Sequence, residues 1–561
     1  MAGLADFARA VLAVALALLR LPLQAIAWVV ETVRLRRALA RSGIPTPPHF
    51  APLGHLPQVA HLKRPHPLTF HRSLEERKAA MAVMETMPIN RWVNSFSPLF
   101  IAWLGPTFPV LIATSPESAK GVLGNSGPNK KSSLYNFLHP WLNLGLLTSS
   151  KPKWKTRRVM LTPSFHFGIL EEYTRVFQKH AAALTARVGA LTAGGKPTHI
   201  YNVFTHVALD IITECATGEA VGALRNGKSE YVQSVYTQLE TVFGRMLNPL
   251  TWTDAVFFNL TPNGRRAAAS LRVLHTHTDA MIARRRRQLF GGGGDGGEGE
   301  GEAEEKARAA RERSQSSADG CSTFLDVLLT AKNPDGTPLD DASIREEVDT
   351  LIFEGHDTTS AGMTWATYLI GCHPEVQAKV HEEVDAVLGD RDVPAYEDLA
   401  SLKYLGACIN EALRCLSPVP FLGRVTEEET EIAGYKVPAG VQVLVPPSVV
   451  HHTHSTWDDH WAFRPERFLD AKRPDTFAFV PFSAGPRGCI GRNFALLEEK
   501  VLLATLFRRF RITVPYDQVV VPSMEIITKP LNGQLLVNAT PRTPGEAFDA
   551  GGAAGAAPAA G

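Results

Sequence analysis

The sequence predicts a mainly α-helical domain with a small β region, preceded by an N-terminal helix that could span a membrane. Apolar residues recur at spacings of three and four, the period of an amphipathic helix, in residues 203–220, 269–289, 343–370 and 494–510. Residues 99–113 (LFIAWLGPTFPVLIA) instead predict two short strands around a Gly-Pro turn. Residues 10–30 are almost wholly apolar.

The composition is that of a large globular protein. With 561 residues, of which 45% are hydrophobic and 20% charged, the chain can bury a sizeable core. The net charge of +2 gives no whole-chain reason to expect nucleic-acid binding. Neither a disulfide framework nor a zinc site is indicated, because the six cysteines are scattered without a C-x-x-C pair: Cys215, Cys321, Cys372, Cys408, Cys415 and Cys489.

Residues 1–31 are predicted to be a membrane anchor. The apolar stretch has the length of a bilayer-spanning helix, and its Leu, Val and Ile residues outweigh the cost of Arg20. By the positive-inside rule, the arginines that follow place residue 50 onward in the cytosol: Arg34, Arg36, Arg37 and Arg41. An interfacial amphipathic helix and an organelle transit peptide stay open as alternatives.

The rest of the chain divides by composition. Residues 32–50 are basic and proline-rich, which predicts a hinge, and the prolines should act as a semi-rigid spacer that lifts the domain off the membrane. One large catalytic domain is expected over residues 51–540. Within it, residues 291–320 are low in complexity and are predicted to form a disordered loop, as is the tail at 541–561.

A glycine-rich loop with one cysteine carries the strongest functional signal. In FSAGPRGCIGRNFA, residues 482–495, Cys489 stands just before a predicted helix. Such a loop can direct several N–H groups at the sulfur, and a helix N-terminus adds partial positive charge. Both effects favour thiolate over thiol, as an iron ligand requires.

This loop resembles that of the cytochromes P450. Five residues stand as in the family pattern F-x-x-G-x-R-x-C-x-G: Phe482, Gly485, Arg487, Cys489 and Gly491. The resemblance implies a haem b cofactor with Cys489 as the axial thiolate ligand, which pushes electron density onto the iron and favours O–O cleavage.

Further motifs agree with the family. Glu411 and Arg414 in EALR, together with Arg467 in FRPERF, resemble its buried structural Glu-Arg-Arg triad. Trp154 and Arg158 resemble its W-x-x-x-R pair, and a spacing of four places the two on one helix face. The resemblance implies that the haem propionates are bound by Trp154, Arg158, Arg424 and Arg487.

The segment EEVDTLIFEGHDTTSAGMTW, residues 346–365, matches the oxygen-activating helix of the family. Glu354, Asp357 and Thr358 are expected to share a face, because they lie three and four residues apart. A small residue such as Gly355 or Gly362 would let haem and dioxygen approach. The Thr358 hydroxyl can bond the carbonyl four residues earlier. Thr358 and Asp357 are the predicted catalytic proton donors.

The stretch EVDTLIFEGHDTT further resembles the signature of family 4, the fatty-acid ω-hydroxylases and their relatives. In that family the acid at the position of Glu354 often forms an ester with a haem methyl group. For this chain a merely buried Glu354 stays open. His451, His452 and His454 follow a family pattern rather than that of a metal site.

The predicted function is hydroxylation of a C–H bond in a fatty acid or related lipid with O2. No flavin or nicotinamide site is evident, so NADPH acts only through a separate reductase, docking on a basic patch that includes Arg492 and Lys500. The predicted location is the endoplasmic reticulum membrane, with the catalytic domain facing the cytosol, or another organelle membrane. Three alternatives stay open: an isomerase or dehydratase of lipid hydroperoxides, a hydroxylase of sterols or other small apolar molecules, and a non-catalytic haem sensor or membrane scaffold.

Overall fold

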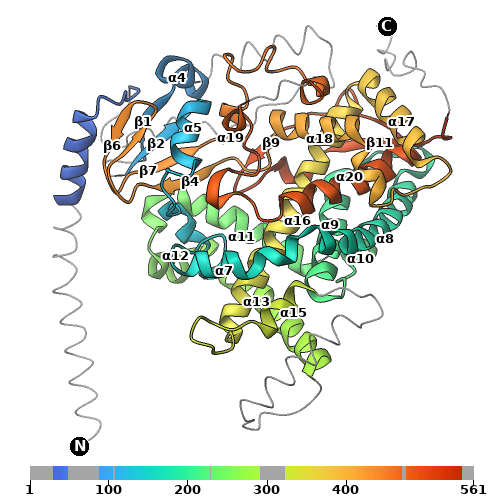
Figure 1. Ribbon diagram of the computed structural model, residues 1–561, viewed down its shortest axis with the longest axis horizontal. Coiled ribbons are helices and arrows are strands. Elements are labelled where there is room, and N and C mark those ends of the chain that lie inside the picture. The colour runs from blue at the N-terminus through green and yellow to red at the C-terminus, as the bar shows by residue number, and fades with distance from the viewer. Residues whose placement is uncertain are drawn as a thin grey trace, which may run out of the picture.

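Figure 1 shows a computed structural model of the chain, which describes residues 30–48, 88–104, 108–227, 229–290, 323–470 and 475–545. Helices make up most of it, and a small sheet lies at one side, so the mainly helical fold with a minor β region is confirmed. No helix within these ranges is both long and apolar enough to cross a membrane. The predicted anchor at 1–31 lies almost wholly outside the described residues. The predicted loop 291–320 lies wholly outside them. Of the predicted disordered tail 541–561, residues 541–545 are described: Pro541 ends the last strand and Arg542 pairs with Asp385, so the prediction is wrong for these residues.

The helical part contains the four helices predicted from periodicity, each shifted or extended by a few residues. They are α9 (Ile200–Thr217), α13 (Pro262–Phe290), α16 (Asp341–Gly371) and α20 (Arg492–Arg509). The other helices are α4 (Pro88–Phe96), α5 (Pro116–Leu123), α6 (His139–Leu142), α7 (Lys153–Leu161), α8 (Phe167–Thr192), α10 (Ala223–Asn226), α11 (Glu230–Met246), α12 (Asp254–Leu260), α15 (Phe324–Thr330), α17 (Pro374–Leu388), α18 (Lys403–Cys415) and α19 (Pro447–Val450).

The β region is centred on a four-stranded sheet of order β1-β2-β7-β4. Strands β1 (Leu99–Trp103) and β2 (Pro109–Ala113) pair antiparallel, as predicted, and β2 pairs parallel with β7 (Gln442–Val445). Strand β4 (Leu422–Val425) closes the sheet beside the site. The shorter pairings involve β3 (Thr198–His199), β5 (Thr430–Ile432), β6 (Tyr435–Val437), β8 (Phe510–Thr513), β9 (Pro522–Met524), β10 (Thr528–Pro530) and β11 (Leu536–Pro541).

The predicted hinge packs against this sheet in its described part. Residues 30–41 are helical. Leu39 and Ile44 are only 2% and 6% exposed and join the apolar cluster around β1 and β7. The Ile101 N–H donates to the Pro45 carbonyl at 2.9 Å. The spacer interpretation is therefore wrong for residues 39–45, because apolar burial and a strand hydrogen bond outweigh the stiffness of the prolines.

Helix α16 is the central element that positions the site. It passes through the middle of the helical part and packs against α9, α18, α20 and α13. The Asp340 side chain caps its N-terminus by accepting from the Ser343 N–H at 2.7 Å. Because neighbours surround α16, even its polar residues Asp357, Thr359 and Ser360 are buried. Its polar groups must therefore find partners inside the protein.

Candidate active site

The cysteine loop is held in a tight backbone conformation before α20. The Cys489 N–H donates to the Phe482 carbonyl at 2.9 Å. Gly485 has φ +63°, and a Cβ there would lie 2.1 Å from the Leu123 carbonyl oxygen. Only glycine fits this turn, both because of the left-handed backbone and because α5 ends directly against it. The Arg158 Nη1 donates to the Gly488 carbonyl at 2.9 Å, which ties α7 to the loop.

The Cys489 side chain is accessible, but it lines a cavity within the protein, where its surroundings still desolvate it. Burial, together with Glu354, raises the pKa of the Cys489 thiol to about 11. The Gly491 amide, Arg158 and Lys131 act in the opposite direction without prevailing. The loop amide thus acts in the expected direction, but burial in the cavity outweighs it. A bound metal ion would be needed to deprotonate the sulfur.

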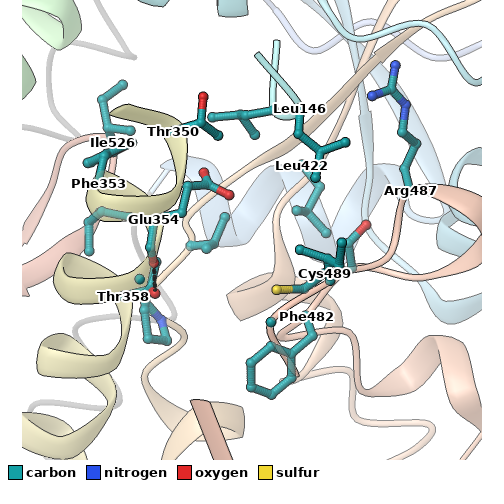
Figure 2. A pocket seen from close by; sticks show the side chains of 18 of the residues that line it. Leu146, Thr350, Phe353, Glu354, Thr358, Leu422, Phe482, Arg487, Cys489 and Ile526 are labelled. Atoms are coloured by element: carbon teal, nitrogen blue, oxygen red, sulfur yellow. Dashed lines mark hydrogen bonds between the residues drawn. The ribbon is translucent and has the colours of Figure 1, made fainter. Parts of the chain in front are cut away.

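The cavity has a volume of about 300 Å³ and lies between α16 and the cysteine loop. Figure 2 shows Phe353, Glu354 and Thr358 on α16 on one side of it. The Cys489 loop lies opposite, with Arg487 at the edge away from α16. Most of the remaining wall is apolar, including Leu146, Leu422, Phe482 and Ile526. An apolar cavity with a few polar groups is typical of a small-molecule site.

Buried cations gather at the end of the cavity near Arg487. Burial and Arg424 lower the pKa of Arg487 to about 9, and its Nη1 has no hydrogen-bond partner among the described residues. Burial, together with Arg424 and Arg487, holds the pKa of Lys131 well below its usual value. No described carboxylate forms an ion pair with Lys131, Arg158, Arg424 or Arg487. Such a group of cations fits an anionic ligand.

The predicted propionate ligands occupy different places around the end of the cavity near Arg487. Trp154 and Arg158 both line the cavity, and the Arg487 guanidinium lies 4.2 Å from the centre of the Trp154 ring. Arg424 does not line the cavity; its guanidinium is buried behind the wall, donating to the Gly423 carbonyl at 3.0 Å. Lys131 was missed in the sequence, because a lysine in a polar stretch carries no local signal of burial.

The acid-threonine segment of α16 is divided between two faces. Glu354 and Thr358 line the cavity, and the Thr358 hydroxyl donates to the Glu354 carbonyl at 2.5 Å, as expected. Asp357 is absent from the lining, and its Oδ1 accepts from the Tyr201 hydroxyl on α9 at 2.8 Å. The prediction of one shared face is wrong for Asp357, since consecutive helical residues point about 100° apart.

Gly355 and Gly362 of α16 serve a different purpose from the predicted one. A Cβ on Gly355 would lie 2.5 Å from the Ile212 Cγ1 of α9. A Cβ on Gly362 would lie 2.5 Å from the Glu499 Oε1 of α20. Close packing against α9 and α20, rather than room for a ligand, is what these glycines provide, although Gly355 also borders the cavity.

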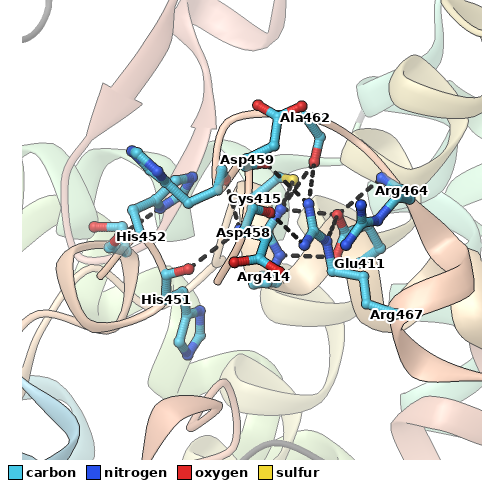
Figure 3. Close-up of polar contacts among 12 residues, drawn as sticks. Glu411, Arg414, Cys415, His451, His452, Asp458, Asp459, Ala462, Arg464 and Arg467 are labelled. Carbon is cyan, nitrogen blue, oxygen red and sulfur yellow. Dashed lines mark hydrogen bonds and ion pairs between the residues drawn. The ribbon is translucent and has the colours of Figure 1, made fainter. Parts of the chain in front are cut away.

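Glu411, Arg414 and Arg467 form the buried triad that the sequence predicts (Figure 3). Arg414 donates to Glu411 through Nε at 2.7 Å and through Nη2 at 2.8 Å. Arg467 Nε donates to the same carboxylate at 3.0 Å. The remaining guanidinium donors reach backbone carbonyls of His451, Asp458, Asp459, His460 and Ala462.

His451 connects this triad to the cysteine loop. Its carbonyl accepts from Arg414 at 3.1 Å, and its Nε2 accepts from the Val480 N–H at 2.9 Å. Burial lowers the pKa of His451 to about 3, which keeps the ring neutral so that Nε2 can accept. The segment leading to Phe482 is therefore fixed by a buried histidine.

The predicted basic docking patch is only partly present. Arg492 is exposed at the start of α20. Lys500 is half-buried, and its ammonium donates to the Leu399 carbonyl at 2.8 Å. Lys500 as part of an exposed basic patch is therefore a wrong interpretation, because its charge is directed into the protein.

Iron protoporphyrin meets the demands of this site, because it is a flat apolar ring with two carboxylates at one edge and a metal that accepts a thiolate. The cations match the carboxylates, the apolar wall matches the ring, and the unpaired sulfur matches the metal. The site is that of a haem-thiolate protein.

Comparisons with known proteins agree. The model of the family "Cytochrome P450" matches residues 81–537. Cytochrome P450 4V2 of Pongo abelii is 38% identical over 81% of this chain and 84% of that relative. The human protein of the same name is 39% identical over 74% of this chain and 76% of its own. Cytochrome P450 4c3 of Drosophila melanogaster is 38% identical over 78% of this chain and 81% of its own.

The chain belongs to the cytochrome P450 family, and these three relatives are of family 4. It is a monooxygenase with a haem cofactor, cysteine thiolate ligation and electrons supplied by a reductase.

Proposed function

We propose that the chain hydroxylates a C–H bond of a fatty acid or related lipid, with Cys489 as the haem ligand. The observation that carries the proposal is the apolar cavity with Cys489 on one side and Thr358 on the other. An apolar wall suits an alkyl chain, since the hydrophobic effect favours its transfer from water. The sequence resemblance to fatty-acid ω-hydroxylases supports the substrate class.

When bound, haem with a thiolate ligand supplies the binding of dioxygen and the cleavage of its O–O bond. The chain's own residues have three tasks in this proposal. Arg158, Arg487 and Trp154 hold the propionates. Lys131 adds positive charge from the cavity lining, and Arg424 adds it from behind the wall. The apolar wall excludes water from the reacting end. Thr358 passes protons into the cavity, and Asp357 resupplies them from the buried side of α16.

Glu354 is proposed to form an ester with the haem. Its side chain lines the cavity, and burial raises the pKa of this carboxyl to about 7. Extraction with acid-acetone tests the linkage. We expect haem to stay with wild-type protein and to be released from Glu354→Gln, which cannot form the ester. Free haem in the wild-type extract would contradict the linkage but not the monooxygenase activity.

Turnover with purified reductase tests the reaction and its substrate. We expect oxygenated product from a panel of fatty acids to require NADPH, reductase and dioxygen together. Conversion of lipid hydroperoxides without reductase, and no NADPH-dependent product, would instead indicate an isomerase or dehydratase. Product from sterols alone would contradict the fatty-acid assignment while leaving the monooxygenase class intact.

We also propose that the chain is anchored in the endoplasmic reticulum membrane with its catalytic domain in the cytosol. The support is the apolar stretch 10–30 and the arginines that follow it. Fractionation followed by protease treatment of intact vesicles tests this. We expect membrane association and digestion of the catalytic domain. Protection of that domain, or import into another organelle, would contradict the assignment.

A further inference from the structure

A short hairpin brings one acid into the apolar part of the cavity. Strands β9 and β10 pair antiparallel, and the three residues that join them, Glu525, Ile526 and Ile527, all line the cavity. Figure 2 shows Ile526 beside Phe353 of α16, on the side of the cavity away from Arg487. The hairpin tip and its acid therefore lie apart from the buried cations near Arg487.

Two hydrogen bonds hold the base of this hairpin in place. The Thr528 N–H donates to the Pro418 carbonyl at 2.7 Å. The Thr528 carbonyl accepts from the Trp365 Nε1 of α16 at 3.0 Å, and Trp365 is 0% exposed. Because β10 is bonded both to α16 and to the segment before β4, the tip keeps a fixed position in the wall. A side chain that discriminates between ligands needs such a rigid support.

Glu525 presents the negative end of an ion pair to the cavity. Its Oε2 lies 3.3 Å from the Lys529 ammonium, and its Oε1 accepts from the Ser523 hydroxyl at 3.0 Å. Lys529 does not line the cavity, and its ammonium lies 4.3 Å from the centre of the Tyr236 ring on α11. Its side chain is 8% exposed, against 22% for Glu525. A carboxylate can accept about four hydrogen bonds, so these partners leave Glu525 acceptor sites for a ligand.

The other acids of the described lining differ from Glu525 in charge. Burial raises the pKa of Glu347 and Glu354 to about 7 and that of Glu499 to about 8. These three acids are therefore partly uncharged near neutral pH. An ammonium and a hydroxyl instead stabilise the carboxylate form of Glu525. The fixed negative charge in the apolar part of the cavity is thus that of Glu525.

We propose that Glu525 determines which polar end of a lipid the cavity binds. Its carboxylate accepts a hydrogen bond from the hydroxyl of a fatty alcohol and repels the carboxylate of a fatty acid. This rests on the proposed function and names the class of lipid that binds most tightly, with fatty acids as weaker substrates. The cations of the described lining, Lys131, Arg158 and Arg487, lie at the other end, where the propionates are proposed to bind. A second carboxylate beside Glu525 would therefore be buried without a counterion, which is costly.

The test uses three ligands with the same alkyl chain. Dodecanol carries a neutral donor, methyl dodecanoate is neutral without a donor, and dodecanoate is an anion. Their affinities for the holoenzyme near neutral pH are measured from the shift of the Soret band on titration. In Glu525→Leu, dodecanol should bind about tenfold more weakly, as expected for the loss of one hydrogen bond to a charged group, and methyl dodecanoate should not weaken. In Glu525→Gln, dodecanoate should bind several-fold more tightly.

A second variant separates repulsion by Glu525 from attraction by its partner. Removing the acid alone leaves Lys529 unpaired, and its ammonium would itself attract dodecanoate. The double variant Glu525→Gln with Lys529→Gln carries neither charge, and the gain for dodecanoate should persist in it. Glu240→Gln is the matched control, because Glu240 pairs with Arg266 at the surface. All three affinities should equal those of wild type in this control.

Three results would overturn the proposal. One is an equal change for all three ligands in Glu525→Leu, which would indicate a structural role. Another is loss of the dodecanoate gain in the double variant. The third is tighter binding of dodecanoate than of dodecanol to wild type, a comparison that needs no variant. Because these affinities are measured without turnover, failure of the proposal differs from failure of the proposed function, which is shown instead when no lipid of the panel is oxygenated with NADPH and reductase.

Discussion

Glu411 is a buried carboxylate that accepts hydrogen bonds from Arg414, Arg467 and the Arg464 N–H. Glu411 and Arg414 are both 0% exposed, so neither can turn to water for a substitute partner. Removing the acid would leave two guanidinium groups without their counterion in the interior, which is costly at any protein site. The triad is stable because each of its charged groups has hydrogen-bond partners inside the protein, rather than because of the attraction between the opposite charges alone.

The Glu411→Ala variant should therefore lose about 3–5 kcal/mol of stability, and little haem-loaded protein should accumulate. The haem-to-protein ratio after purification checks this. Glu240→Ala is the matched control, because Glu240 pairs with Arg266 at the surface and should contribute at most about 1 kcal/mol. A haem ratio in Glu411→Ala equal to that of the control would contradict the structural role.

Glu499 on α20 is an acid that destabilises the folded state when ionised. Burial raises its pKa to about 8 in the folded protein, from 4.5. The folded state then binds more protons than the unfolded state between these values, so stability falls as pH rises through this window. Buried histidines such as His451 have lowered pKa values and act in the opposite direction below about pH 6.5. Buried acids should therefore determine how the free energy of unfolding changes with pH between 6.5 and 8.

The Glu499→Gln variant should accordingly be more stable than wild type at pH 8, by an amount on the order of a few kcal/mol. Its free energy of unfolding should also vary less with pH between 6.5 and 8. Denaturant titrations at several pH values measure both. An unchanged slope in the variant would show that Glu499 does not titrate in this range.

At the scale of whole elements, the contact between α16 and α9 positions the site. Gly355 lets Ile212 approach α16, and further along α9 toward its N-terminus Tyr201 reaches Asp357. The same closeness explains why α16 can present Thr358 to the cavity while its opposite face stays buried. Separation of these two helices would disturb packing and the polar contact together.

Replacing Gly355 with alanine should destabilise the fold by about 1–3 kcal/mol, because the new Cβ overlaps the Ile212 side chain. Thermal unfolding of the holoenzyme measures the loss. In the double variant Gly355→Ala with Ile212→Ala, the total loss should be smaller than the sum of the single losses, since the overlap is removed. Additive losses would show that the two side chains do not compete for the same space.

At the scale of the whole molecule, the helical part and the sheet meet around the cavity. Strand β4 brings Leu422 and Gly423 to the wall, α16 brings Glu354 and Thr358, and the cysteine loop closes the opposite side. These segments are far apart in the sequence. The triad and His451 hold these segments together, because they fix the position of the residues that lead into the cysteine loop.

Local patterns were sufficient to predict four of the helices and the strands β1 and β2, but not α8 at Phe167–Thr192. The triad was predicted from the resemblance to the family. Periodicity predicted a helix at 343–370, and the structure has α16 at Asp341–Gly371. The prediction that Asp357 shares a face with Glu354 and Thr358 failed. Residues three and four positions after Glu354 both lie near it, but they point about 100° apart around the helix axis. The burial of Lys131, the inward turn of Lys500 and the contact of Tyr201 with Asp357 depend on tertiary packing, which leaves no local pattern in the sequence.

The central claim is that Cys489 is the thiolate ligand of the haem iron. The difference spectrum of the reduced protein with and without carbon monoxide tests it most directly, using wild type and Cys489→His, whose imidazole can still ligate iron. Wild type should show the strongly red-shifted Soret band of thiolate ligation, and the variant should retain haem but lack that band. A wild-type spectrum without the band, or a variant that keeps it, would contradict the account.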